Sequence, residues 1–122
     1  DIGFYTKTLF KEPPLKPLID IPRMAEIDVS MLKKVLDSYT ERSAEKALDV
    51  IKMDDEVDDL NDHIFRELMT YVQEDAKAIN RVLELVLIAR SYERIGDHAV
   101  NIAEDVVYMV RGQDIRHLKG EV

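Results

Sequence analysis

The stretch that decides the fold runs from residue 75 to residue 111 and reads DAKAINRVLELVLIARSYERIGDHAVNIAEDVVYMVR. Its apolar residues recur at steps of three and four, which is the spacing of one face of an α-helix. The expected buried face consists of Val82, Leu85, Ala89, Ile95, Ala99, Ile102, Val106 and Met109. At 1.5 Å per residue such a helix is about 55 Å long, and we expect Gly112 to cap its C-terminus.

Two further helices are expected before this one. Asp20 is a suitable N-cap for a helix that ends near Arg42 and has Pro22 in its first turn. Ser43 is a suitable N-cap for the next, which ends near Val72. Their apolar stripes are Met24, Ile27, Met31, Val35 and Tyr39, followed by Val50, Met53, Val57, Leu60, Ile64, Leu68 and Tyr71. The sequence therefore predicts an all-α protein, an elongated antiparallel three-helix bundle over residues 22–117.

The two ends are expected to lie outside this bundle. Pro13, Pro14 and Pro17 crowd into the N-terminal segment, and proline interrupts helices. We therefore interpret residues 1–21 as a Pro-rich arm, either a linker or the end of a preceding repeat. Residues 118–122 are expected to form a short tail.

Composition narrows the function classes. The chain has 122 residues, a formal net charge of -8 and no cysteine. An acidic chain without a basic run is a poor nucleic-acid binder, so we expect no nucleic-acid partner. The lack of cysteine excludes disulfides and thiolate metal ligands and suits a cytoplasmic location. No apolar run reaches the roughly 20 residues of a membrane span.

Four oxygen-bearing side chains of the third expected helix share one face, within about 80° of arc at about 100° per residue. They are Glu93, Asp97, Asn101 and Glu104. This face lies away from the centre of the apolar stripe, which predicts a position at the surface or edge of the bundle. No nucleophile–base pair or cofactor motif accompanies it, so we do not expect an enzyme.

The second expected helix repeats this arrangement. Asp54, Asp58 and Asp62 follow one another at i, i+4 and i+8, next to Asp55 and Asp59. Like charges at this spacing repel by about 0.2–0.5 kcal/mol per pair unless water or a cation offsets them. Two helices with such pairs can clamp a cation, and oxygen-only ligands suit Mg²⁺, Ca²⁺, Mn²⁺ or iron.

Two observations leave room for a simpler interpretation, in which these acids are solvated surface groups. Arg90 and Arg94 stand at i, i+3 from Glu93 and Asp97 and can neutralise them. Gly96 costs a helix about 1 kcal/mol relative to alanine, which indicates either tight helix packing or close approach at a metal site. The three histidines, His63, His98 and His117, are isolated and are expected at the surface.

Several segments resemble the PhoU family. The run Ala89-Arg90-Ser91-Tyr92-Glu93-Arg94-Ile95-Gly96-Asp97-His98-Ala99-Val100-Asn101-Ile102-Ala103-Glu104 is similar to its signature helix. Similar segments are Arg66-Glu67-Leu68-Met69-Thr70-Tyr71-Val72 with Glu74-Asp75, and Gly112-Gln113-Asp114-Ile115-Arg116-His117. The likeness covers residues 31–117 and implies one repeat of a protein built from two three-helix bundles.

The resemblance also implies a metal site. The family's acid-x-x-x-acid motifs correspond to Glu93 with Asp97 and to Asp54 with Asp58, and Asn101 and Glu104 extend the first motif. A divalent or trivalent ion is implied, among iron, zinc, manganese and magnesium.

The function implied by the resemblance is that of a non-enzymatic negative regulator of the phosphate-starvation response. It would act in the cytoplasm as an adaptor between the ATPase of a phosphate ABC transporter and a sensor histidine kinase, reaching the inner membrane only through these partners. A homodimer is expected. Two alternatives stay open: a metal-independent helical interaction domain and a ferritin-like di-iron carboxylate protein. The latter is disfavoured because no Glu-x-x-His pair is present.

Overall fold

The computed structural model describes residues 17–118, with side chains from residue 20 to residue 113. Three long helices account for nearly all of this range: α2 (Pro17–Glu41), α3 (Ala44–Glu74) and α4 (Ile79–Leu118). A single 3-10 turn, η1 (Ala76–Ala78), joins α3 to α4. The predicted all-α, elongated three-helix bundle is confirmed.

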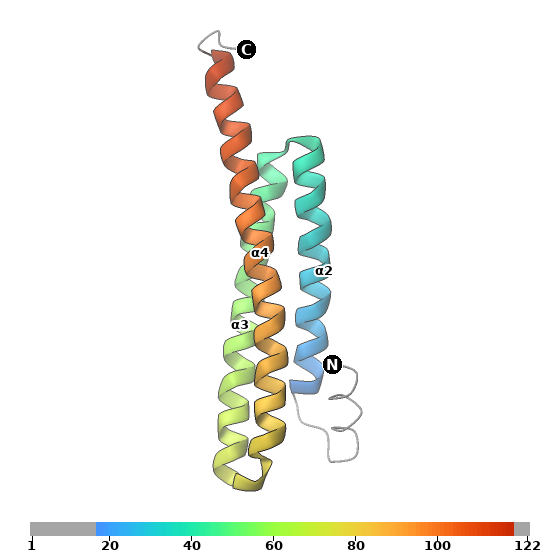
Figure 1. Ribbon diagram of the computed structural model, residues 1–122, viewed down its shortest axis with the longest axis vertical. Coiled ribbons are helices and arrows are strands. Elements are labelled where there is room, and N and C mark those ends of the chain that lie inside the picture. The colour runs from blue at the N-terminus through green and yellow to red at the C-terminus, as the bar shows by residue number, and fades with distance from the viewer. Residues whose placement is uncertain (1–16, 119–122) are drawn as a thin grey trace.

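The helices lie alongside one another, α2 and α4 in the same direction and α3 in the opposite one (Figure 1). The turn between α3 and α4 projects beyond the first residues of α2, and the end of α4 projects beyond the turn between α2 and α3 (Figure 1). None of the described helices has the length and apolar character needed to cross a membrane.

Local hydrogen bonds fix both turns. The backbone N–H of Lys46 donates to the Ser43 hydroxyl at 3.1 Å, which confirms Ser43 as the N-cap of α3. Arg42, with φ at 53°, provides the left-handed step between α2 and α3. At the other turn, the Lys77 N–H donates to the Asp75 carboxylate at 3.0 Å. Both turns are therefore short, and they hold the helices antiparallel.

Two predicted boundaries are wrong. Residues 17–21 belong to α2, because proline at the first helical position lacks only an N–H that the helix does not use. Gly112 does not end α4, which continues through it to Leu118. An added Cβ at Gly112 would meet nothing within 4 Å, so nothing in its surroundings requires a glycine there.

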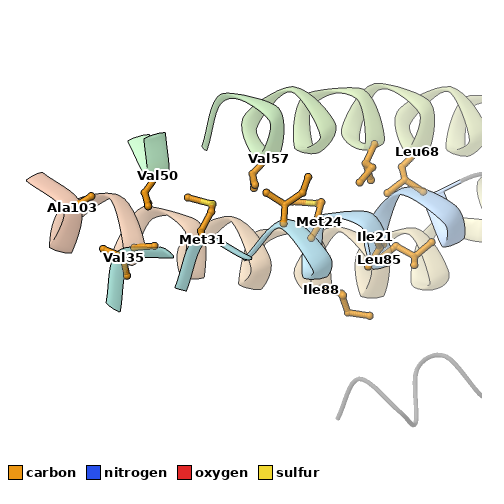
Figure 2. Close-up of a cluster of buried hydrophobic side chains, with 14 of the residues drawn as sticks. Ile21, Met24, Met31, Val35, Val50, Val57, Leu68, Leu85, Ile88 and Ala103 are labelled. Atoms are coloured by element: carbon orange, nitrogen blue, oxygen red, sulfur yellow. The ribbon is translucent and has the colours of Figure 1, made fainter. Parts of the chain in front are cut away.

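The core lies along the axis between the three helices, and residues such as Met24, Met31, Val57 and Leu68 meet there (Figure 2). Most of the predicted core positions are buried. Seven predicted members are wholly or partly open to solvent: Tyr39, Met53, Leu60, Tyr71, Ile95, Ile102 and Met109. Six apolar residues that the predicted stripes omitted are buried: Ile21, Ala47, Ala78, Ile88, Ala103 and Val107.

Small residues explain why the buried face of α4 differs from the predicted one. Gly96, Ala99 and Ala103 face the axis and let the helices come close together, so the larger Ile95 and Ile102 are displaced to the edge of the stripe. This close approach occurs at the level where the carboxylates gather.

Candidate metal centre

One acid lies inside the bundle. Asp28 of α2 occupies a position of the apolar stripe and is only 2% exposed. Neither of its carboxylate oxygens has a hydrogen-bond partner among the described residues. A buried ionised carboxylate without partners is strongly unfavourable, so the site needs either a proton or a cation.

The other two helices bring further acids to the same level. Asp54 and Asp58 come from α3 and Asp97 from α4, and each offers an oxygen within 4.8 Å of the oxygens of the other two. Asp54 is partly buried and its Oδ1 also lacks a partner. Glu93, one turn before Asp97, contacts the Asp58 carboxyl group closely enough for a hydrogen bond between them. We call these five residues the acidic cluster: Asp28, Asp54, Asp58, Glu93 and Asp97.

At Gly96 the backbone of α4 passes close to two of these carboxylates. A Cβ placed on it would lie 2.7 Å from Oδ1 of Asp54 and 3.3 Å from Oδ1 of Asp28. The first distance is too short for any real side chain. Glycine at this position therefore makes room for carboxylates from both neighbouring helices.

Burial, and after it the nearness of other carboxylates, raises the pKa of four members. Burial, followed by the charges of Asp54 and Asp97, raises the pKa of Asp28 to about 7. Burial, followed by the nearby carboxylates, raises the pKa of Asp54 to about 6. The pKa values of Asp58 and Glu93 are also raised, first by loss of water and then by neighbouring acids. All these shifts show that the metal-free cluster resists holding its full negative charge.

Among the described side chains, residues 20–113, no basic group pairs with the acidic cluster. No ion pair joins Arg90 or Arg94 to an acid in the described part of the chain, although Glu93 and Asp97 stand at the right spacing. The ion pairs of the described residues involve acids outside the cluster, as in Arg23–Glu56 at 3.0 Å. Neutralisation by arginine, the simpler interpretation of the sequence, is therefore not found among these residues.

The predicted site residues separate into two groups. Asp54, Asp58, Glu93 and Asp97 come together in the cluster. The remaining two, Asn101 and Glu104, are exposed farther along α4, where no described contact links them to it.

Asp28 was missed by the sequence analysis. The signal was present, because Asp28 lies four residues after Met24 and seven before Val35, within the apolar stripe of its helix. A charged residue at such a position is informative, since acids are rarely buried without a partner.

This arrangement fits a metal ion. Carboxylate oxygens from three helices converge, two of the acids have buried oxygens without partners, and a glycine keeps the space open. Asp54, Asp58 and Asp97 offer only carboxylate oxygens, which suit Mg²⁺, Ca²⁺, Mn²⁺ or iron better than softer ions. A bound cation would supply the positive charge that offsets the repulsion between these acids.

The comparisons with known proteins identify relatives. A family model described as PhoU domain matches residues 21–106. The chain is 44% identical over 113 residues to a phosphate-specific transport system accessory protein PhoU homolog 2 of Thermotoga maritima, covering 93% of this chain and 48% of the relative. It is 49% identical over 88 residues to a PhoU homolog of Pseudomonas aeruginosa, covering 72% of this chain and 36% of the relative.

A solved structure agrees with these matches. The crystal structure of PhoU from Pseudomonas aeruginosa superposes with a TM-score of 0.73 at 42% sequence identity, covering 77% of this chain and 45% of that one. The chain thus spans about half the length of the curated relatives it matches.

Proposed function

The chain belongs to the PhoU family, and from this premise we propose that it is a non-enzymatic negative regulator of the phosphate-starvation response. The relatives' names, accessory proteins of a phosphate-specific transport system, support a role in regulating phosphate transport. In this proposal the protein acts as an adaptor between the transporter ATPase and a sensor histidine kinase.

An adaptor of this kind works by preferential binding. It shifts a kinase toward its inhibited state only if it binds that state more tightly than the active one, since equal affinity shifts nothing. The proposal has the protein acting in the cytoplasm and reaching the membrane through its partners. Three exposed apolar residues on one side of α2, Leu32, Leu36 and Tyr39, support self-association as a homodimer.

The observation that carries the metal part of the proposal is the buried, unpartnered Asp28 beside Asp54 at the junction of three helices. A cation held there by the acidic cluster joins α2, α3 and α4 and removes their mutual repulsion. Asp28, Asp54, Asp58, Glu93 and Asp97 would be its ligands. In this role the ion sets the rigidity of the bundle and the charge of its surface; it performs no chemical reaction.

A reporter assay in cells tests the regulatory role. A strain lacking its own copy and carrying a promoter that responds to phosphate starvation should be repressed at high phosphate by the wild-type protein. The quadruple variant Asp54→Asn, Asp58→Asn, Glu93→Gln, Asp97→Asn should lose this repression while the protein stays present. The control Asp59→Asn, an exposed acid of the same helix, should retain it. Failure of the wild-type protein to repress would contradict the regulatory role, and full repression by the quadruple variant would contradict the metal part.

A further inference from the structure

A second surface of α4 has no partner within the described residues. Ile79, Leu83 and Leu87 follow one another at i, i+4 and i+8 on one face of α4, and this row begins at the end of α4 that projects with α3 beyond the start of α2 (Figure 1). They are 42%, 51% and 59% exposed, and Phe65 of the neighbouring α3 is 50% exposed. An exposed row of large apolar side chains along a helix is typical of a surface that binds another protein.

The same helical face continues into two arginines. Arg90 and Arg94 stand seven residues after Leu83 and Leu87, which is two turns along the same row. Both are exposed, and no described carboxylate lies within ion-pair distance of either. Two adjacent guanidinium groups without an acid are unexpected in a chain whose net charge is -8.

Two hollows border this row. One of about 290 Å³ is lined by Leu87, Arg90, Ser91 and Arg94. The other, of about 170 Å³, lies between α3 and α4 and is lined by apolar residues that include Phe65 and Val86, together with Arg90 and Glu93. The surface therefore offers depressions for apolar side chains with positive charge beside them.

We propose that this surface, the α4 docking face formed by Phe65, Ile79, Leu83, Leu87, Arg90 and Arg94, binds an amphipathic helix of a partner protein that carries two carboxylates. The apolar side of that helix would cover the leucine row, and its acids would accept hydrogen bonds from the two guanidinium groups. The proposal deepens the adaptor role and rests on it for the kind of partner. From Ile79 to Arg94 the face is about 22 Å long, which a helix of about four turns matches.

Other occupants fit less well. A second copy related by a two-fold axis would place arginine against arginine if parallel, or arginine against the leucine row if antiparallel, because the face is apolar at one end and basic at the other. A free phosphate ion would satisfy the arginines and leave the apolar row uncovered. An acidic amphipathic helix satisfies both halves of the face.

A pair of synthetic helices tests the proposal. The acidic probe is a fluorescent helix of about 20 residues with Leu at i, i+4 and i+8 and Glu at i+11 and i+15, which matches the spacing of the face. The basic probe has Lys in place of both Glu residues. By fluorescence anisotropy the wild-type chain should bind the acidic probe about tenfold more tightly than the basic one. The variant Arg90→Glu with Arg94→Glu should reverse this preference, and Leu83→Ser with Leu87→Ser should weaken both probes.

Further arms identify the occupant. In cells expressing the protein at high phosphate, a photo-crosslinking residue at Leu87 should capture a partner, and the crosslinked peptide should be an acidic amphipathic segment. Capture of a second copy would overturn the proposal, as would equal affinity for the two probes. So would a chain that binds inorganic phosphate through Arg90 and Arg94 but neither probe. If the variant Arg90→Glu with Arg94→Glu still represses the starvation reporter, the proposed docking face is wrong, and the adaptor role is unaffected. If only the variants of the acidic cluster lose repression, that result concerns the proposed metal site and not the docking face.

Discussion

The acidic cluster and the α4 docking face overlap along α4, where Arg94 lies between Glu93 and Asp97 in the sequence, and both leave charges without a counter-charge from the described residues. The cluster crowds carboxylates from three helices into a partly buried space around Gly96. The docking face spreads two arginines along an open surface beside leucines. The first arrangement has room for a small cation, and the second for a macromolecule.

The difference between the two regions shows that the burial of a charged group, as well as its sign, decides what kind of ligand it can bind. Charges without partners that are removed from water change their own pKa, as those of Asp28 and Asp54 do. Charges without partners that remain in water, such as those of Arg90 and Arg94, gain little from a lone ion and more when an apolar surface is covered at the same time.

The largest expected effect concerns the buried acid. In metal-free protein, the raised pKa of Asp28 means that the folded state holds a proton which the unfolded state releases. The free energy of unfolding should therefore fall as the pH rises between the unfolded pKa of 3.8 and the folded pKa of about 7, by an amount on the order of 4 kcal/mol for Asp28.

Asp28→Asn should abolish most of this loss. Urea unfolding in the presence of a chelator, at about pH 5 and about pH 8, should show the variant to be about 3 kcal/mol more stable than wild type only at the higher pH. Asp59→Asn, an exposed acid of α3, is the matched control and should behave like wild type. A wild-type chain equally stable at both values would contradict the account of the cluster.

Metal binding should have the next largest effect. A cation at about one hundred times its dissociation constant stabilises the folded chain by about 2.7 kcal/mol, which corresponds to a rise in Tm of roughly 10 °C for a domain of this size. Thermal unfolding with Mn²⁺, Mg²⁺, Ca²⁺, Zn²⁺ and ferrous iron would measure it. Asp97→Ala should remove the shift, and an unchanged shift in that variant would place the ion elsewhere.

Gly96 allows a finer test of the same site. Gly96→Ala adds a methyl group 2.7 Å from Oδ1 of Asp54, so that carboxylate must move away from the ion. We expect metal affinity, measured by calorimetry, to fall about tenfold, because one ligand is displaced. Gly112→Ala, whose added methyl meets nothing within 4 Å, should raise stability by about 1 kcal/mol and leave affinity unchanged. Equal affinities in the two variants would show that Gly96 has no role at the site.

The smallest expected effect is that of the two arginines of the α4 docking face on metal binding by the acidic cluster. If Arg90 and Arg94 do not neutralise the cluster, Arg90→Gln with Arg94→Gln should change metal affinity by no more than about twofold and stability by no more than about 0.5 kcal/mol. Calorimetry and urea unfolding would measure both. A large gain in metal affinity would mean that the arginines compete with the ion, and the two regions would then be one.

The sequence predicted most of the fold because long stripes of apolar residues leave little choice of secondary structure. It could not predict that Gly112 would remain helical, since glycine favours the position after a helix and costs about 1 kcal/mol inside one. The prediction of Ile95 and Ile102 as core residues was also wrong. The small residues Gly96, Ala99 and Ala103 occupy the buried face of α4 instead, and only the packing of the three helices reveals this.

The site was predicted in part for a similar reason. The repeated spacing of acids predicted one acidic face on each of two helices, and the resemblance to the PhoU family singled out Asp54 with Asp58 and Glu93 with Asp97 on these faces. To predict Asp28 as a member of the cluster, one must know which residues of the three helices lie at the same level, and this depends on the register of the helices in the bundle. Within one stripe it was a single acid among apolar residues, and it acquired meaning only beside Gly96.

Elemental analysis of the purified protein tests whether the acidic cluster binds a metal ion. The chain purified without a chelating tag, loaded with each candidate metal and dialysed, should retain at least one ion per chain for one of these metals. Asp59→Asn should retain as much, and Asp28→Asn and Asp97→Ala should each retain much less. Wild-type protein that retains no metal, or an Asp97→Ala variant that retains as much as wild type, would contradict the proposal that these three helices share a cation.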